Sequence, residues 1–487
     1  MSETMNTVEY RRAKLWQIIL IAFNAFNGMA MYFLIGLASY SASIGYDIAT
    51  VLVGGLLTFT RLFDAITDPL LAFLYDRVNT PFGKVRPLML GGWLIQSIGV
   101  LCMFNFFSSK GHGVPTFLLF YMVYVVGYTI VNMTAQTLPA LITNDPKQRP
   151  MVGVWSTVLN YMTPMALNIV VYTVLMPKYG GSFNQEFLNI VTWLCVGISL
   201  VGVILVCIGI SAYDKPENFE GIGKREQLKI ADMIDVLKNN KPLQAYIISA
   251  GSDKIAQQAS SASIVGTMLS GILIGNMGLA TTLSMIGMFP SILFAIFGAR
   301  YAGKHGNKES IVTWTKNCIY ANIAIIAFFI IVNMTVGTKS IASMGPTMIL
   351  YILLTLITSG FAMCVTTANT GFMADIIDYE LDRSNKYIPA VVTGTYSLID
   401  KIVSSFSAAI ATGCVALIGY TTTMPQPTDP QTTGVFWMTM FLRFGLAILG
   451  WLCTLWAMRS CNLGKEEMVA VQARIADKKA EAQKTLA

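Results

Sequence analysis

Long apolar runs alternate with short polar connections along almost the whole chain, as six runs, a charged gap and six more. Each run is long enough to cross a bilayer as a helix, which needs about 20 residues, and the longest predict tilted helices. The pattern predicts an all-α polytopic membrane protein with twelve transmembrane helices in two six-helix bundles. The runs lie at about 15–40, 50–75, 87–107, 115–141, 151–176, 187–212, 243–274, 278–300, 310–336, 346–377, 389–420 and 434–459.

Composition and charge placement support this interpretation. The chain is 54% hydrophobic and 12% charged, whereas a soluble domain carries about 25% charged residues. Lys and Arg concentrate in the loops that share a side with the N-terminus, while the opposite loops hold only Lys110, Lys178 and Lys339. The asymmetry predicts that both termini are cytoplasmic in a multi-pass protein of the inner (plasma) membrane. Because the basic residues lie in short loops, the net charge of +7 gives no indication of nucleic-acid binding.

The charged gap divides the chain into four predicted parts. An N-terminal six-helix bundle covers 1–212 and a C-terminal one covers 243–461. The central cytoplasmic loop, 213–242, includes a short amphipathic helix because its second half has apolar residues at helical spacing. The remaining 462–487 is a polar helical tail that we expect to be solvated. Two six-helix halves joined by a cytoplasmic loop are typical of secondary transporters built from repeats.

The second apolar run contains three charged residues. Arg61, Asp64 and Asp68 follow one another at i, i+3 and i+7, so they line one face of a helix. Charges at membrane depth are costly and usually mark an ion or substrate path. Two carboxylates about one turn apart predict a site for a small cation. The alternative is a structural ion pair between Arg61 and one Asp, which leaves the other Asp unexplained.

Two further pairs of charges lie near the membrane midplane. Lys254 comes about 12 residues into the seventh run, which is about 18 Å along a helix; Asp253 adjoins it, and Asp400 and Lys401 form a similar pair in the eleventh run. Neighbours on a helix point about 100° apart, so we expect only one of each pair to face a central cavity squarely. We favour the lysines as inward-facing. Pairing with neighbouring helices is the alternative.

Amide and hydroxyl side chains beside aromatic residues suit a sugar, which needs many hydrogen bonds and an apolar face. The fourth run carries Tyr128, Thr129, Asn132 and Gln136, and the tenth carries Thr366. Polar residues in such runs also join helices to one another, which is the alternative for each of them. Arg443 in the last run is isolated, and the sequence assigns it no role.

Charged residues at the cytoplasmic ends of two predicted helices form a candidate gate. Asp375 and Asp378 lie at the end of the tenth run, and Asp145 and Arg149 follow the fourth. These residues could close the inner side as a charge lock. The alternative is ordinary solvated charge at helix ends, which contributes little to stability.

An intramembrane enzyme would need a nucleophile and base, or a set of metal ligands, at membrane depth. No His lies within any apolar run, since His112 and His305 are in loops. The eight Cys are scattered singly, without a Cys-x-x-Cys pair, and predict buried apolar residues. We therefore expect no catalytic residue and no cofactor beyond a coupling ion.

Several motifs identify a resemblance over nearly the whole chain to about residue 460. RLFDAITDP with TPFGKVRP, then YTIVN, then ADIIDYE, resemble the glycoside–pentoside–hexuronide:cation symporters, the melibiose permease-like branch of the major facilitator superfamily. The resemblance implies a major facilitator fold and symport of a glycoside or sugar acid with Na⁺ or H⁺ by alternating access. The implied partners are a small sugar, a monovalent cation and the lipid bilayer, and we expect a functional monomer.

The resemblance also implies roles for particular residues. The family's cation site consists of two Asp and a Thr, which match Asp64, Asp68 and Thr129, and a nearby Lys matches Lys401. The family's galactoside pocket contains two acids, a base and a Trp, and these positions are occupied here by Met29, Asn132, Gln136 and Thr157. This departure disfavours an α-galactoside, and with Lys254 it makes an acidic sugar such as a hexuronide a candidate.

Two alternatives within the same fold stay open. One is a sodium-coupled carrier of lysophospholipids, which would need a wide apolar pocket; the many Asn, Gln and Thr side chains argue against it. The other is a sugar sensor that does not transport, which only a flux measurement would distinguish.

Overall fold

Helices account for almost all regular structure in the computed structural model, which describes residues 12–77, 80–108, 111–143, 149–215, 230–385 and 388–486. The described residues contain only one isolated β-bridge, between Thr80 and Gly83. The chain divides into two compact units. The N-terminal unit is Met1–Lys224 with Thr422–Met424, and the C-terminal unit is Arg225–Thr421 with Pro425–Ala487.

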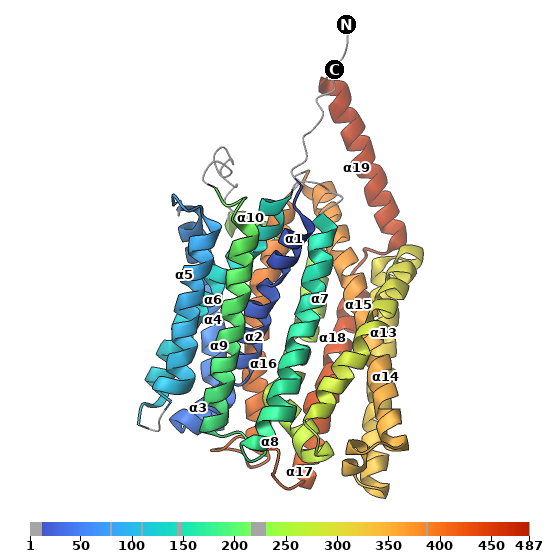
Figure 1. Cartoon of the computed structure of the whole chain (residues 1–487). Helices are drawn as coiled ribbons and strands as arrows, with labels where there is room; N and C mark the ends of the chain where they lie inside the picture. Colours follow the sequence, from blue (N-terminus) through green and yellow to red (C-terminus); the bar gives the residue numbers. More distant parts are fainter. Residues whose placement is uncertain are drawn as a thin grey trace. The chain divides into compact units, whose positions relative to one another are not determined.

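In the N-terminal unit the long helices run lengthwise beside one another (Figure 1), with α5 packed on α6 and α2 on α7 and α9. The first predicted helix is broken into three pieces, and π-helical turns continue α5 and α7. The elements are α1 (Leu15–Ala22), α2 (Asn24–Gly36), α3 (Ala38–Tyr46), α4 (Thr50–Arg77), α5 (Val85–Leu101), η1 (Cys102–Phe106), α6 (Gly113–Ile142), α7 (Arg149–Asn168), η2 (Ile169–Leu175), α8 (Met176–Lys178) and α9 (Gln185–Ile210).

In the C-terminal unit α11 packs between α16 and α18, and α15 packs against α13 and α14. The elements are α10 (Ile230–Asn239), α11 (Lys241–Ser260), α12 (Ser263–Gly266), η4 (Thr267–Ile274), α13 (Gly278–His305), α14 (Asn307–Thr335), η5 (Thr338–Ala342), α15 (Pro346–Ser384), α16 (Pro389–Leu417), α17 (Thr433–Met440), η6 (Phe441–Gly445), α18 (Leu446–Ser460) and α19 (Lys465–Leu486). The seventh predicted helix is interrupted where Ala262 takes an extended ψ of 140°.

Helices occupy each of the twelve stretches that the hydrophobic pattern predicts. Within the described residues, nine candidate helical spans are long and apolar enough to cross a membrane. The stretches formed by α4, α11 and α13 are not among them. Of these, α11 carries Asp253, Lys254, Gln257 and Gln258, so its lower hydropathy reflects side chains that suit a wet cavity. The full set of twelve spans and the cytoplasmic termini stay predictions.

Small residues bring several helix pairs into close contact. A Cβ atom added to Gly127 of α6 would overlap the backbone of Gln96 on α5. In the other unit, one added to Gly298 of α13 would lie 2.8 Å from the Cα of Cys364, and one added to Gly450 of α18 would lie 3.0 Å from the carbonyl oxygen of Ser252. Since lipid tails are as apolar as the helix surfaces, close packing of this kind is what holds membrane helices together.

The TPFGKVRP motif forms a cap on α5. The buried carboxylate of Asp214, just after α9, accepts backbone N–H bonds from Lys84, Val85 and Arg86 at 2.9, 3.0 and 2.8 Å. The Nε of Arg86 adds an ion pair at 3.2 Å. A carboxylate at a helix N-terminus accepts hydrogen bonds from otherwise unpaired N–H groups and interacts favourably with the positive end of the helix dipole. The motif therefore ties the start of α5 to the end of α9.

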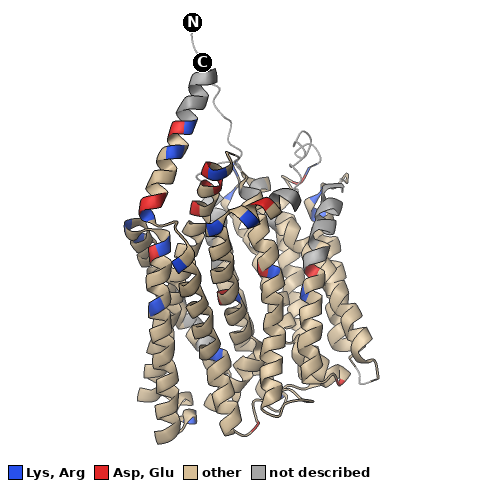
Figure 2. Cartoon of the chain, turned by 180° about the vertical axis from the view of Figure 1, so that it is seen from behind, with Lys and Arg blue, Asp and Glu red and all other residues tan. Residues whose placement is uncertain are grey.

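In each unit the charged residues gather toward one end of the long helices and are sparse along their lengths (Figure 2). Spanning helices need this distribution because a charge is much cheaper at the membrane surface than in the hydrocarbon core. The few charges along the helices are therefore the ones that need a functional or structural explanation.

The C-terminal helix α19 differs from the solvated tail that the sequence predicts. Val471 is fully buried and Ile475 is 5% exposed, and Met468 packs against the same apolar cluster of the C-terminal unit. On the same helix, Arg474 and Lys478 both form ion pairs with Asp382 of α15, at 2.7 and 2.9 Å. The prediction of a solvated tail is wrong for this face, because apolar residues spaced three and four apart give the polar helix one surface to bury.

Candidate functional site

The structure brings Asp64 and Thr129 together in the N-terminal unit. Thr129 Oγ1, on α6, donates a hydrogen bond of 2.9 Å to Asp64 Oδ1, on α4. These residues are 65 positions apart in sequence, and Thr129 is only 3% exposed. A carboxylate and a neutral oxygen meet here on two packed helices, which is the kind of ligand set that a hard cation prefers.

The other two charges of α4 are less fully described. Arg61 and Asp64 are both described, and no ion pair between these two side chains is among the described contacts. The alternative of a structural ion pair between Arg61 and one Asp stays open, because it includes Asp68. Asp68 lies on α4, but its side chain is outside the described residues, so its predicted place beside Asp64 stays a prediction.

A line of tyrosines on α6 leads to Thr129. Tyr128 stacks on Tyr124 with ring centroids 5.7 Å apart, and Tyr124 meets Tyr121 edge-on at 5.9 Å. Of the other predicted sugar contacts, Met29 on α2 is half-buried and Asn132 on α6 is exposed. The side chains of Gln136 and Thr157 lie outside the described residues. Tyr128 and Asn132 therefore flank Thr129 in sequence on one helix, while their contact with a substrate stays a prediction.

A cavity of about 410 Å³ lies within the C-terminal unit. Its volume falls in the range of about 300–1,000 Å³ that is usual for small-molecule sites. Side chains from α11, α14, α15, α16, η6 and α18 line it, and these include Lys254 and Thr366 from the predicted substrate contacts. Lys401 and Asp400 are not among the lining residues. The structure thus places two of the predicted contacts in one cavity and Lys401 outside its wall.

Asp253 and Asp400, the acidic residues of the two Asp–Lys pairs, each accept a hydrogen bond from a neighbouring side chain. Thr454 Oγ1 donates to Asp253 Oδ1 at 3.1 Å, and the Tyr396 hydroxyl donates to Asp400 Oδ1 at 3.4 Å. Asp400 also interacts electrostatically with Lys254. Both Asp253 and Lys254 line the cavity. Both residues therefore border this cavity, and the expectation that only one of them faces a substrate squarely stays a prediction.

Arg443 is the cavity residue that the sequence left unassigned. It lies in the π-helical turn η6, lines the same cavity, and donates from Nη1 to the carbonyl oxygen of Ser260 at 3.0 Å. In the sequence, Arg443 stood out only as an isolated charge in an apolar run. Such a charge marks a functional candidate, but it does not show which residues lie beside it in the fold.

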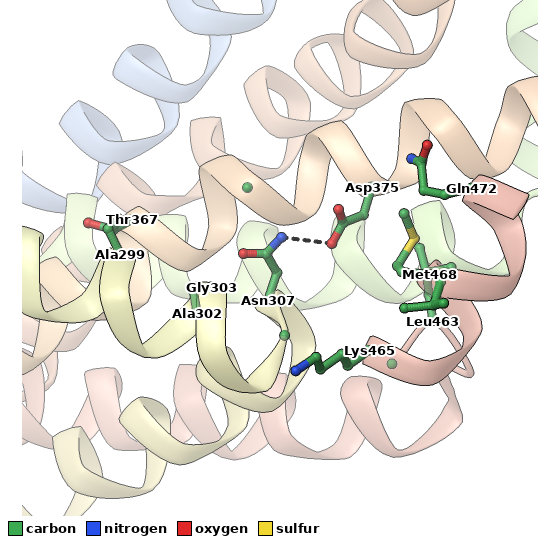
Figure 3. Close-up of a pocket in the computed structure, with 14 residues that line it drawn as sticks. Ala299, Ala302, Gly303, Asn307, Thr367, Asp375, Leu463, Lys465, Met468 and Gln472 are labelled. Atoms are coloured by element: carbon green, nitrogen blue, oxygen red, sulfur yellow. Dashed lines mark hydrogen bonds between the residues drawn. The ribbon is translucent and has the colours of Figure 1, made fainter. Parts of the chain in front are cut away.

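Only the C-terminal side of the predicted gate is described. Asp375 accepts a 2.8 Å hydrogen bond from Asn307, beside a cavity of about 650 Å³ bordered by α13, α15 and α19 (Figure 3). Asp378 accepts a 2.7 Å bond from Gln472 of α19. Asp145 and the side chain of Arg149 lie outside the described residues. The acidic end of α15 thus anchors parts of its own unit, and its role as a charge lock stays a prediction.

The docked helix α19 gives a testable consequence. We expect Val471→Asp to release α19 from α15, because it would bury an unpaired charge at a cost of several kcal/mol. Limited proteolysis of the tail should then be about tenfold faster or more. Val469→Asp is the matched control, since Val469 is on the same helix and 65% exposed. Equal proteolysis rates for the two variants would contradict the docked arrangement.

Comparison with known proteins agrees with these features. The model of the MFS/sugar transport protein family matches residues 17–465. Solved structures with similar folds include a bacterial homologue of the human drug peptide transporters PepT1 and PepT2, with a TM-score of 0.61, 12% identity and coverage of 96% of this chain and 99% of that one. A bacterial homologue of the human lysosomal transporter Spinster has a TM-score of 0.59 at 12% identity, with the same coverage. At this identity the structures support the fold alone.

Similar sequences have more specific names. The putative glycoside/cation symporter YagG of Escherichia coli (strain K12) is 24% identical over 408 residues, or 82% of each chain. The glucuronide carrier protein homolog of the same organism is 27% identical over 245 residues, covering 50% of this chain and 51% of the relative. The isoprimeverose transporter of Lactiplantibacillus pentosus is 24% identical over 203 residues, or 40% of each. The resemblance of the motifs is thereby confirmed, and the chain belongs to the MFS/sugar transport proteins, within the glycoside–pentoside–hexuronide:cation symporters.

Proposed function

We propose that this protein is a secondary active transporter that carries a glycoside or a sugar acid across the inner membrane together with Na⁺ or H⁺. Alternating access between two six-helix halves is the mechanism that its family membership favours. The observation that supports coupling most strongly is the 2.9 Å hydrogen bond between Thr129 and Asp64, which joins two long helices at a carboxylate. The names of its relatives, a glycoside/cation symporter, a glucuronide carrier and an isoprimeverose transporter, favour a sugar as the cargo.

Coupling would follow from the chemistry of this pair. In the structure, the Thr129 hydroxyl donates its hydrogen to Asp64. A cation at Asp64 would neutralise the carboxylate, and the hydroxyl could turn so that its lone pairs face the cation. Asp68, one helical turn further along α4, would supply the second carboxylate. A cation between two carboxylates offsets their mutual repulsion, so its binding is favourable.

The sugar would sense this change through α6. Tyr128 directly precedes Thr129, and Asn132 lies one turn beyond Tyr128 on the same helix. Ordering Thr129 around a cation would order these side chains as well. Each ligand would then raise the affinity of the other by the same factor, as linkage requires.

Uptake into proteoliposomes tests this proposal. The panel consists of methyl glucoside, methyl galactoside, methyl xyloside and methyl glucuronide, each with an inward Na⁺ gradient, an inward proton gradient or no gradient. We expect at least one sugar to accumulate above its external concentration only when a cation gradient is present. Binding without flux would indicate a sensor. Uptake of a lysophospholipid and of no sugar would favour the lipid-carrier alternative.

A further inference from the structure

The cavity of the C-terminal unit has an excess of positive charge. Its charged lining residues are Lys254, Arg443 and Asp253, which are two cations and one carboxylate. A single isolated charge in a membrane segment is costly unless it has a partner. Each of the three therefore needs a counterpart in the protein or in a ligand.

The described contacts of these three charges within the protein are few. Asp253 accepts a hydrogen bond from the neutral Thr454 hydroxyl at 3.1 Å. The charge of Lys254 acts on Asp400 of α16, although these two described side chains form no ion pair. Arg443 likewise forms no ion pair with a described residue. In the part of the chain that the structure describes, no carboxylate lies within ion-pair distance of its guanidinium, and its one hydrogen bond is to the neutral carbonyl oxygen of Ser260, at 3.0 Å.

The planar guanidinium group of Arg443 is suited to a carboxylate ligand. A guanidinium has five N–H donors, which can grip both oxygens of a carboxylate in parallel bonds. Ser260 accepts from only one of them. Lys254 lies six residues earlier on α11, or about 9 Å along its axis, so a ligand of sugar size could meet both cations.

The rest of the wall suits a sugar ring. Asn369 Oδ1 is buried without a hydrogen-bond partner, and Asn369 lines the cavity. An unsatisfied buried acceptor is costly, and a sugar hydroxyl would satisfy it. Trp451 and Tyr396 add aromatic surface to the lining, against which the C–H face of a sugar can pack.

We propose that Arg443, assisted by Lys254, binds the carboxylate of an acidic glycoside and selects it over the neutral analogue. This inference rests on the proposed function and specifies its substrate class. The ring hydroxyls would bond to amides such as Asn369, and the negative charge would compensate Arg443. In a neutral glycoside the hydroxymethyl group replaces the carboxylate, so Arg443 would stay uncompensated.

A purely structural role for Arg443 makes a different prediction. Ser260 is the last residue of α11, and a basic side chain on a terminal carbonyl stabilises a helix end. Loss of that contact would disturb the cavity for every sugar alike. The ratio of affinities for an acidic and a neutral glycoside separates the two roles.

The experiment compares methyl β-D-glucuronide with methyl β-D-glucoside, which differ only at C6. Binding to the purified full-length protein is measured by ligand-dependent thermal stabilisation, and transport by Na⁺-driven uptake. The parent should bind the glucuronide about tenfold more tightly or better, since a charge-assisted bond is lost in the glucoside. Arg443→Gln should remove most of this preference and change glucoside affinity less than about threefold. Arg443→Lys should restore part of it.

Matched variants keep the test decisive. Arg459→Gln removes an exposed charge from the end of α18 and should leave the preference unchanged. If Arg443→Gln fails to fold, Arg443→Lys and Lys254→Gln should each still lower the preference. Equal losses for both sugars, or a parent that favours the glucoside, would overturn the carboxylate site while leaving symport intact. Selective binding without gradient-driven accumulation would instead overturn the proposed transport function alone.

Discussion

Replacing Asp64 by Asn is expected to abolish accumulation of sugar against its gradient while leaving downhill exchange measurable. Asn has nearly the same shape, and its side-chain oxygen can still accept the hydrogen bond from Thr129. Only the negative charge that attracts the cation is lost. The accumulation ratio in proteoliposomes with an inward Na⁺ gradient should therefore fall to about one, because binding is no longer coupled to a cation. Exchange of labelled for unlabelled sugar should persist.

Asp47→Asn is the matched control for this prediction. Asp47 is an exposed carboxylate in the same unit, with a left-handed φ of 56° that Asn tolerates well. It should accumulate sugar as the parent does. Asp68→Asn should behave like Asp64→Asn if both carboxylates hold the cation. Full concentrative uptake by Asp64→Asn would remove this residue from the cation site.

Sodium dependence is the second large expected effect. At fixed pH, uptake should fall to the passive rate when Na⁺ is replaced by N-methylglucamine, a cation too large for a paired-carboxylate site. We favour Na⁺ because Thr129 offers a neutral oxygen that a hard cation can use. Thr129→Val should then raise the Na⁺ concentration for half-maximal uptake about tenfold, the effect expected from a lost ligand worth 1–2 kcal/mol.

The control for Thr129→Val lies on the same helix. Thr134 is fully buried, and its hydroxyl donates to the backbone oxygen of Ile130 rather than to an acid. Thr134→Val should leave the Na⁺ dependence unchanged. Uptake that ignores Na⁺ but follows a pH gradient would show that a proton is the coupling ion, as a carboxylate with a raised pKa allows.

The sequence identified the two residues of the Thr129–Asp64 contact in different ways. Asp64 was identified by its charge in an apolar run, and Thr129 by its resemblance to the family pattern. Their contact depends on the packing of α4 on α6, which periodicity alone does not specify, and only the family resemblance paired them. The presence of the helices was predictable because a long apolar run that crosses a bilayer can satisfy its backbone hydrogen bonds by itself only as a helix.

The cavity around Arg443 could not be predicted in the same way. Its lining comes from five helices and a π-helical turn, so it requires knowledge of which faces meet. The turn η6 is one such feature, since a π-helical turn changes the angular position of the residues that follow it. The sequence showed only one Arg among apolar neighbours, with no spacing to connect it to Lys254.

The ends of helices were predicted less well where a helix continues beyond its apolar run into charged residues. The apolar run that predicts α15 stops near residue 377, whereas the helix continues to Ser384 through acidic residues. Those residues stay helical because Asn240 and Arg383 bond Glu380, and α19 bonds Asp378 and Asp382. Hydropathy detects the membrane-spanning part of a helix but not its extension beyond that part.

Sugar-driven movement of Na⁺ is the most direct measurement of coupled transport by this protein. The parent is reconstituted into proteoliposomes with equal Na⁺ on both sides and a trapped Na⁺-sensitive dye, and a transported glycoside is added outside. An inward sugar gradient should draw Na⁺ inward above its starting concentration, and Asp64→Asn should eliminate this signal. Sugar entry with no movement of Na⁺ or protons would contradict cation symport.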